Sequence, residues 1–345
     1  MTKLPKRTIV GVLVAALLIV AAIFFQQQGN GGNGDAFELR RSEFLMSTVV
    51  EALVYTEDEA LGQEALSAAY RRAAELEAIM DRHQSDSDVA KINAAAGQNP
   101  VAVSEETFEV IRQGVEFGQM TGGAFDITVA PVMELWGFGS GENRVPDDEE
   151  LERALELVDY RKIHLDEERL EVFLEKEGME LDLGGIAKGY IVDQALLTMQ
   201  EMGIESASFD AGGDIRVLGI KPDGTPWRIG IRDPRDRTNL AAIVELDDQS
   251  VVTSGDYERF FMEDGQRYHH ILDPDTGIPT RGLTSVTVLG EDAITTDTLS
   301  TGLFVMGLES GMELIESLAD TEAIFITDDG QVHTSSGLDD QVEIL

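Results

Sequence analysis

The chain has 345 residues, 43% of them hydrophobic, and a formal net charge of −39 from 65 acidic and 26 basic residues. It contains no cysteine, which excludes disulfides, thiolate metal sites, cysteine nucleophiles and a lipid anchor on an N-terminal cysteine. The excess of acid argues against non-specific binding of nucleic acid, because phosphate backbones require a basic surface.

Residues 1–25 are expected to form a membrane anchor or a signal segment. Basic residues precede an unbroken apolar run over 9–25, and 26–36 follow as a polar linker rich in Gly and Asn. A short membrane span and a cleaved signal peptide share this pattern. The apolar run continues past a possible cleavage position at 20–22, which favours an uncleaved anchor. The basic flank then predicts a single pass through the cell inner membrane, with a domain over 37–345 on the periplasmic, extracytoplasmic side.

The first half of this domain is rich in helical periodicity. We expect a strand over 44–56 and helices over 59–82, from Ser104 onwards, and over 146–158 with Pro146 at the start. The spacing of apolar side chains near 3.6 residues supports the first two helices.

The second half is dominated by short strands. We expect strands over 162–165, 170–174, 207–209, 215–218, 227–231, 242–246, 251–253, 260–262, 270–272, 285–289 and 324–326, and helices after Gly184-Gly185, over 295–306 and over 310–318. Helices and strands do not alternate regularly, so a doubly wound parallel sheet is disfavoured and a layered α+β fold is predicted.

The acidic residues are spread along the whole chain, and only 7 of the 26 basic residues are lysine. A dense carboxylate surface stays soluble where salt screens its self-repulsion, so we interpret the composition as a sign of a halophilic source. An ordinary acidic surface is the alternative.

Asp297 and Thr301 lie four residues apart at the start of an expected helix, on one face. Two oxygen donors arranged in this way suit a hard cation such as Mg²⁺, which takes few protein ligands and completes its shell with water and phosphate. The alternative is that Asp297 caps the helix and Thr301 bonds back to the backbone.

The segment 182–189 is a glycine-rich turn that leads into a helix, with Lys188 in its first turn. Backbone N–H groups at a helix start favour anionic oxygen, so the two segments together indicate a metal-dependent enzyme that acts on a phosphate-bearing ligand. Lys188 alone is a weak signal, and no Walker-type phosphate loop is present.

Three further segments carry polar groups next to expected strands. The turn 210–214 is either a plain hairpin or a close backbone approach to a ligand, and Ser254 either donates to a phosphate or caps a turn. His269 and His270 are adjacent on an expected strand, so at most one of them faces a given pocket.

Taken as an ordered set, these segments resemble the ApbE family of FAD:protein FMN transferases. The segments that carry the resemblance are 46–48, 80–83, 121–131, 181–190, 210–215, 253–257, 270–274 and 296–301. The resemblance implies a layered α+β, T-fold-like architecture with mostly antiparallel strands. It also implies an enzyme that cleaves FAD, transfers FMN to a Ser or Thr of an acceptor flavoprotein and releases AMP.

The same resemblance implies the roles of individual residues. It places the metal, Mg²⁺ or alternatively Mn²⁺, on Asp297, Thr301 and the carbonyl of Gly185. It assigns catalytic roles to His270 and Asp297. It places FAD against Met46, His83, Ala124, Phe125, Asp126, Asp182, Lys188 and Leu272.

Two positions depart from the family pattern: Ser47 replaces the usual glycine of a Met-Gly-Thr motif, and His83 stands where an aromatic residue is common. By analogy the acceptor is a subunit of a membrane redox pump or a secreted flavoprotein. The alternatives are a FAD pyrophosphatase with water as the acceptor, a membrane-tethered flavin-binding protein without turnover, and an anchored solute-binding protein.

Overall fold

The computed structural model describes residues 36–138, 143–236, 238–338 and 341–345. The expected anchor over 1–25, and the linker apart from its last residue, lie outside these ranges. Within the described ranges, no helix combines the length and the apolar character that crossing a membrane requires.

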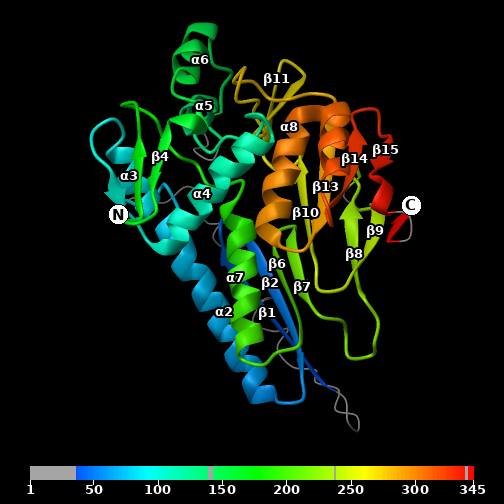
Figure 1. Cartoon of the computed structure of the whole chain (residues 1–345). Coiled ribbons are helices and arrows are strands. Elements are labelled where there is room, and N and C mark those ends of the chain that lie inside the picture. Colours follow the sequence, from blue (N-terminus) through cyan, green and yellow to red (C-terminus); the bar gives the residue numbers. More distant parts are fainter. Residues whose placement is uncertain (1–35, 139–142, 237, 339–340) are drawn as a thin grey trace, which may run out of the picture.

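An eight-stranded sheet with the order β1-β2-β6-β7-β10-β13-β14-β15 forms the centre of the fold (Figure 1). Its strands are β1 (Phe37–Leu45), β2 (Thr48–Thr56), β6 (Ser206–Ala211), β7 (Asp214–Leu218), β10 (Ser250–Gly255), β13 (Leu283–Gly290), β14 (Glu322–Thr327) and β15 (Val332–Thr334). Every neighbouring pair is antiparallel. The prediction of an α+β fold with mostly antiparallel strands is therefore confirmed.

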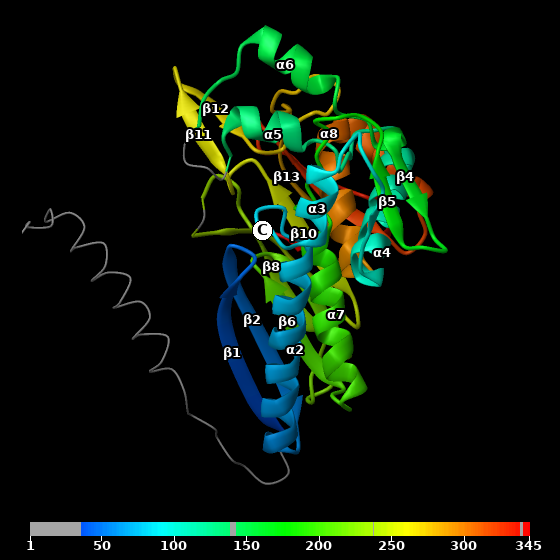
Figure 2. The ribbon, with the colours of Figure 1, turned by 90° about the vertical axis from the view of Figure 1, so that its left-hand side faces the viewer.

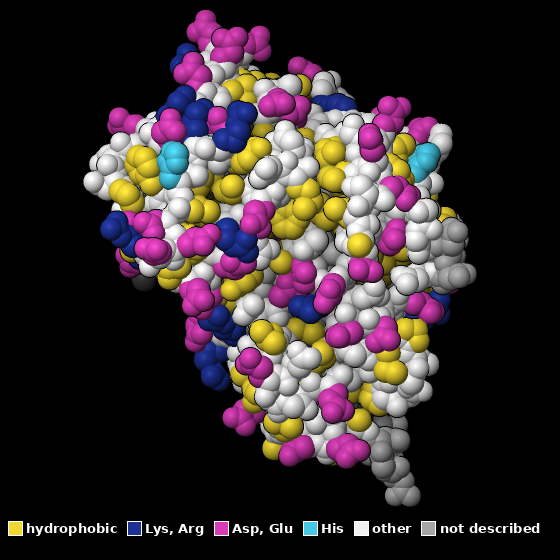
Figure 3. All heavy atoms as spheres, in the orientation of Figure 1, with side chains coloured by type: hydrophobic (Ala, Val, Ile, Leu, Met, Phe, Trp, Pro, Cys, Tyr) yellow, Lys and Arg dark blue, Asp and Glu magenta, His cyan; other side chains and the backbone are white. Residues whose placement is uncertain are grey.

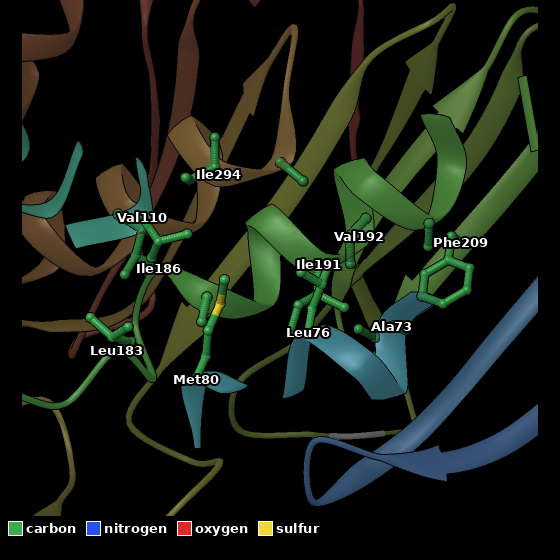
Figure 4. Close-up of a cluster of buried hydrophobic side chains, with 14 of the residues drawn as sticks. Ala73, Leu76, Met80, Val110, Leu183, Ile186, Ile191, Val192, Phe209 and Ile294 are labelled. Atoms are coloured by element: carbon green, nitrogen blue, oxygen red, sulfur yellow. The ribbon is translucent and has the colours of Figure 1, made fainter. Parts of the chain in front are cut away.

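Three long helices, α2 (Glu59–Met80), α7 (Ala187–Glu201) and α8 (Ala293–Ser317), cover one face of this sheet (Figure 1). Their buried side chains meet in one cluster, in which Figure 4 labels Leu76 and Met80 of α2, Ile191 of α7 and Ile294 of α8. Burying a side chain of this size stabilises the fold by about 1.5–3 kcal/mol. The cluster therefore fixes the three helices against one another.

A second, three-stranded sheet with the order β16-β9-β8 packs on the other face. Its strands are β8 (Trp227–Arg232), β9 (Leu240–Leu246) and β16 (Val342–Ile344). Trp227 and Val244 lie in one buried cluster with Val251 of β10 and Ile324 of β14. The central sheet is thus covered on both faces.

Smaller elements surround one end of the layers (Figure 2). They are α3 (Asp88–Ala94), α4 (Glu105–Met120), α5 (Ala130–Trp136), α6 (Asp148–Leu155), β3 (Val101–Ala102), β4 (Ile163–Asp166), β5 (Glu171–Leu174), β11 (Phe260–Glu263), β12 (Gln266–His269) and the 3-10 turn Tyr160–Lys162. A second 3-10 turn, Ser336–Leu338, lies beside β14. The β11–β12 hairpin and α5 lie at the same end of the molecule (Figure 2).

The single strand predicted over 44–56 is wrong, because this segment contains the turn of a hairpin. β1 pairs with β2, and Met46 and Ser47 connect them with φ angles of 50° and 59°. Positive φ at both central positions is the signature of a type I′ turn. The prediction failed because neither residue is Gly, Asn or Asp, so the apolar pattern ran through the turn without a break.

One further prediction needs correction. The strand expected over 270–272 is absent: β12 ends at His269, and Leu272 forms only an isolated bridge with Pro279. The two helices expected over 295–306 and 310–318 are confirmed: α8 consists of two helical segments that meet at a kink at Gly307, where φ is 78°. Glycine accepts this backbone conformation without strain, so the chain resumes the helix after it.

Candidate active site

A pocket of about 600 Å³ lies where the glycine turn before α7, the first half of α8 and the loops around them meet. Its lining contains every site residue expected from the sequence: Met46, His83, Ala124, Phe125, Asp126, Asp182, Gly185, Lys188, His270, Leu272, Asp297 and Thr301. These residues come from six segments that are distant in the sequence and share one cavity, although their individual roles stay predictions.

Asp297 lies one turn inside α8. Asp292 is the helix cap, since its Oδ1 accepts a hydrogen bond from the Thr295 N–H at 2.8 Å. The alternative of Asp297 as the cap is therefore wrong. Its Oδ2 instead accepts from the N–H of Gly189 on α7, at 2.9 Å.

Burial raises the pKa of Asp297 to about 8, and the neighbouring carboxylate of Asp214 adds to the shift. Lys188 and the Gly189 N–H oppose it. An ionised carboxylate this deeply buried, beside a second one, is costly unless positive charge compensates it. The position therefore favours a bound cation.

Thr301 and Gly185 supply uncharged oxygens next to Asp297. The Thr301 hydroxyl lies 3.2 Å from that of Ser254, and a side-chain carbon built on Gly185 would lie 3.6 Å from the Thr301 Oγ1. The described ranges hold no cluster of three or more His, Cys, Asp or Glu side chains suited to a metal. One carboxylate with a hydroxyl and a carbonyl is a donor set that fits Mg²⁺, which keeps several water or phosphate ligands.

Lys188 is the second residue of α7, and its ammonium donates to Oδ1 of Asp214 at 2.8 Å. Burial lowers the pKa of Lys188, but the charges of Asp214 and Asp297 outweigh this and leave it raised. Lys188 therefore stays protonated inside the pocket. The turn 210–214 connects β6 to β7 and is a hairpin, and Ala211, Gly212 and Asp214 also line the pocket, so the close approach of this turn to a ligand stays a prediction.

Asp182 is held in place by one hydrogen bond and one ion pair. Its Oδ1 accepts from the N–H of Gly184 at 2.7 Å, and the guanidinium of Arg82 lies 3.1 Å from Oδ2. Arg82 also pairs with Glu134 at 3.1 Å. Sequence reasoning missed Arg82 as a site residue, although it lies in the segment 80–83 next to His83.

Asp126 has a mainly structural role. Its Oδ1 accepts from the Thr128 N–H at 2.8 Å and its Oδ2 from the Tyr160 N–H at 2.9 Å, and burial raises its pKa. These bonds fix the loop that places Phe125 against the Gly185 turn, where a ring carbon lies 3.2 Å from a side-chain carbon built on Gly185. Asp126 therefore positions the neighbouring wall of the pocket.

His270 follows β12 and faces the pocket, whereas His269 does not. The Nε2 of His269 lies 2.9 Å from the Thr280 carbonyl. The Nδ1 of His270 is buried and has no hydrogen-bond partner within the described residues. Burial, with a contribution from Arg259, lowers the pKa of His270 to about 3. Its imidazole is therefore neutral at physiological pH and available as an acceptor.

The turn at Met46 and Ser47 forms another part of the rim. The Met46 N–H donates to Oε1 of Glu77 at 2.8 Å, which ties the turn to the end of α2. The φ of Ser47 is positive, a backbone conformation that glycine adopts without strain. A non-glycine residue pays roughly 1–2 kcal/mol for this conformation.

The charge of the pocket lining is acidic overall. Its carboxylates are those of Glu77, Asp81, Asp126, Asp182, Asp214, Glu258 and Asp297, against the cations of Arg82, Lys188 and Arg259. Seven acids against three bases would repel a phosphate ligand in the absence of an added cation. Glu77, Asp214, Glu258 and Arg259 were not predicted, since each depends on contacts between distant segments.

Comparison with known proteins agrees with this geometry. The model of the ApbE family matches residues 46–325. A protein from Treponema pallidum (strain Nichols) named FAD:protein FMN transferase is 34% identical over 331 residues, which cover 91% of each chain.

Solved structures give the same result. The crystal structure of the ApbE protein from Thermotoga maritima has a TM-score of 0.82 and 36% identity, covering 87% of this chain and 98% of that one. The flavin transferase ApbE from Vibrio cholerae has a TM-score of 0.79 and 33% identity, covering 89% and 99%. Because the family model matches residues 46–325, a range that includes every segment of the pocket, the chain belongs to the ApbE family.

Proposed function

We propose that this chain is a FAD:protein FMN transferase. It cleaves the diphosphate bridge of FAD, joins the FMN phosphate to the hydroxyl of a Ser or Thr on an acceptor flavoprotein, and releases AMP. The proton of the attacking Ser or Thr hydroxyl passes to the phosphate of the released AMP or to a nearby base. The observation that carries the proposal is the single pocket that unites the cationic Lys188, the buried Asp297 and the neutral His270.

Asp297, Thr301 and the Gly185 carbonyl would hold Mg²⁺, with Mn²⁺ as the alternative. When bound, the ion neutralises charge on the diphosphate and compensates the acidic lining. Support for this part comes from the raised pKa of Asp297 and from the excess of carboxylates around the pocket.

The residues of the chain have separate tasks. Lys188 stays protonated and presents positive charge to a phosphate oxygen, while Arg259 adds a second cation at the rim. The neutral His270 lines the pocket and is the proposed acceptor for the proton of the attacking hydroxyl. His83, Met46 and Leu272 line the part of the pocket left for the rings of FAD.

Two other functions would use the same pocket. A FAD pyrophosphatase would transfer FMN to water, and a flavin-binding protein would leave FAD intact. The decisive experiment incubates the protein with FAD, Mg²⁺ and an acceptor that carries a target Ser or Thr, and records the acceptor by mass spectrometry. A gain of one FMN phosphoester supports the proposal, free FMN without an adduct supports the pyrophosphatase, and full recovery of FAD supports the binding protein.

We also propose that residues 1–25 anchor the chain in the inner membrane, with the enzyme on the periplasmic side near a membrane redox pump or secreted flavoprotein. The basic flank and the apolar run over 9–25 support this placement. Acidic side chains are spread over the face seen in Figure 3, in keeping with the proposed halophilic source. A melting temperature that does not rise with added NaCl would contradict that source.

A further inference from the structure

Helices α7 and α8 meet in an antiparallel ladder with three contacts, each four residues from the next on both segments. A side-chain carbon at Gly185 would lie 3.6 Å from the Thr301 hydroxyl, and the Gly189 N–H donates to Asp297 at 2.9 Å. At the third contact, Asp193 accepts from the Ala293 N–H at 2.8 Å. A spacing of four residues places Ala293, Asp297 and Thr301 on one side of α8, and Gly189 and Asp193 on one side of α7, while Gly185 lies in the turn just before α7.

The first two contacts of this ladder contain the residues proposed to hold the cation, and they are short on side chains. A side-chain carbon at Gly189 would lie 2.2 Å from the Ala293 carbonyl oxygen, so the two backbones approach as closely as they can. Apolar packing alone does not define the axial position of such a smooth contact strongly, since few side chains interlock there. Directional contacts such as the Gly189–Asp297 hydrogen bond are therefore needed to fix the register.

Asp193 supplies a directional contact at the third position. Its Oδ1 accepts from the Ala293 N–H and its Oδ2 from the Ile294 N–H at 3.0 Å, both in the first turn of α8. The guanidinium of Arg216 donates to the same Oδ1 at 2.6 Å. Asp193 is only 7% exposed, so these bonds are sheltered from water.

Arg216 extends the connection to the sheet. It lies on β7, two residues after Asp214, whose carboxylate binds the ammonium of Lys188. One carboxylate therefore joins β7, α7 and α8, and each of these elements carries a pocket residue. Every partner of Asp193 named above is a donor, and a buried carboxylate with several donors is strongly directional.

We propose that Asp193 is a positioning residue for the cation site of Gly185, Asp297 and Thr301. It fixes the register of α7 against α8 and so sets the separation between the Gly185 carbonyl and the two side chains on α8. This inference rests on the proposed function only in calling those three residues a cation site. The register itself is independent of that assignment.

The test compares two helix caps of α8. Asp193→Asn keeps the shape but turns a donor toward donors. Asp292→Asn keeps the cap on α8, because its amide oxygen can still accept from the Thr295 N–H, and it does not touch α7. Both variants lose one carboxylate at the same helix start, but only Asp193→Asn loses hydrogen bonds between the two helices and is expected to melt earlier. Only the first is expected to disturb the contact between the helices.

The first readout is amide hydrogen exchange in the protein without added metal. Asp193→Asn should speed exchange of the Gly189 N–H by at least about tenfold, because its acceptor on α8 shifts, whereas Asp292→Asn should leave it within about twofold. Unchanged protection of Gly189 in Asp193→Asn, or equal loss in both variants, would overturn the inference.

The second readout is Mn²⁺ affinity, measured by electron paramagnetic resonance with Asp297→Asn as a reference. Loss of a residue that supports a metal ligand lowers metal affinity by about 10–100-fold. We expect a loss of Mn²⁺ affinity of this size for Asp193→Asn and little change for Asp292→Asn. If Asp297→Asn does not weaken Mn²⁺ binding, the cation site itself is wrong, and the exchange data still decide the register. If Asp297→Asn weakens it and Asp193→Asn does not, the positioning role is wrong.

Discussion

The two walls of the pocket are built differently. The helix wall (Gly185, Lys188, Asp297 and Thr301) belongs to the start of α7 and to α8, and its groups are bonded to one another or to buried partners. The loop wall (Met46, His83, His270 and Leu272) comes from a hairpin turn, a helix end and the segment after β12. His83 is exposed, and Met46 is half-buried.

This difference separates two physical tasks. Stabilising a diphosphate requires charges that do not reorganise, and burial between two helices provides that. Holding flat aromatic rings requires area and access, which turns at a rim provide. We therefore expect changes in the helix wall to reduce the rate of transfer and changes in the loop wall to alter FAD binding, with His270 as the exception.

The largest effect is expected for Asp297→Ala. Removing the carboxylate of the cation site should lower FMN transfer at least about 1000-fold, because a metal-stabilised transition state loses several kcal/mol. The lost hydrogen bond from Gly189 costs only about 1 kcal/mol, so the fold should persist. Transfer is measured by acceptor mass spectrometry with Mg²⁺, and folding by circular dichroism. Normal turnover in a folded variant would contradict the assignment of Asp297 to the cation site.

His270→Asn comes next and tests the exception. Loss of a proton acceptor costs about 10²–10⁴-fold in rate, so transfer should slow far more than FAD binding weakens. Titration calorimetry with FAD and single-turnover transfer separate the two quantities. Equal losses of FAD affinity and of transfer rate would show that His270 only binds FAD, like the other residues of the loop wall.

The pH dependence of His270 follows from its burial. Its pKa lies near 3 in the folded protein against 6.5 ordinarily, so the folded state binds the proton less well than the unfolded chain. Its contribution to stability is therefore complete above pH 6.5 and is lost as the pH falls toward 3. The rate of transfer should show no inflection from His270 between about pH 5 and 8, and an inflection there that disappears in His270→Asn would contradict this.

Much of this site could be predicted from the sequence, and the reason is its local character. The glycine turn over 182–185, Lys188, and the pair Asp297 and Thr301 each sit in a short segment with recognisable spacing, and all of them line the pocket. The α+β fold followed from the irregular order of helices and strands. Periodicity also located α2 and α4 to within a few residues.

The failures share a different physical cause. The ion pairs of Lys188 with Asp214 and of Arg82 with Asp182 join residues far apart in the chain, and no local pattern reports them. The alternative of Asp297 as the cap of α8 stayed open in the sequence because Asp292 and Asp297 both suit a helix start, and only the contacts of the folded chain distinguish them. The β1–β2 turn was missed because the pairing of two strands, and not the turn residues, determines it.

Gly189→Ala tests how closely the helix wall must pack. The added carbon would lie 2.2 Å from the Ala293 carbonyl oxygen, which forces α7 and α8 apart. Overpacking of this kind costs about 1–3 kcal/mol, measured by urea unfolding, and transfer should fall with it. Gly311→Ala is the matched control, because its carbon meets a Phe325 ring atom at 3.0 Å in the second half of α8. Gly311→Ala should lower the stability without lowering the rate of transfer. An equal loss of transfer in both variants would show that transfer falls with overall stability and not with the packing of the helix wall.

The smallest effect is expected at the rim, for His83. An aromatic ring that stacks on FAD contributes about 0.5–1.5 kcal/mol beyond its buried area, so His83→Ala should raise the KM for FAD by about two- to tenfold. His83→Phe should keep or lower that KM, because phenylalanine buries more apolar surface than imidazole. In both variants kcat should stay near that of the wild type, since His83 lies in the loop wall and not beside Asp297. Steady-state transfer at varied FAD separates the two constants. A fall in kcat at unchanged KM would show that the loop wall also organises the reacting groups, and the division of tasks between the walls would fail.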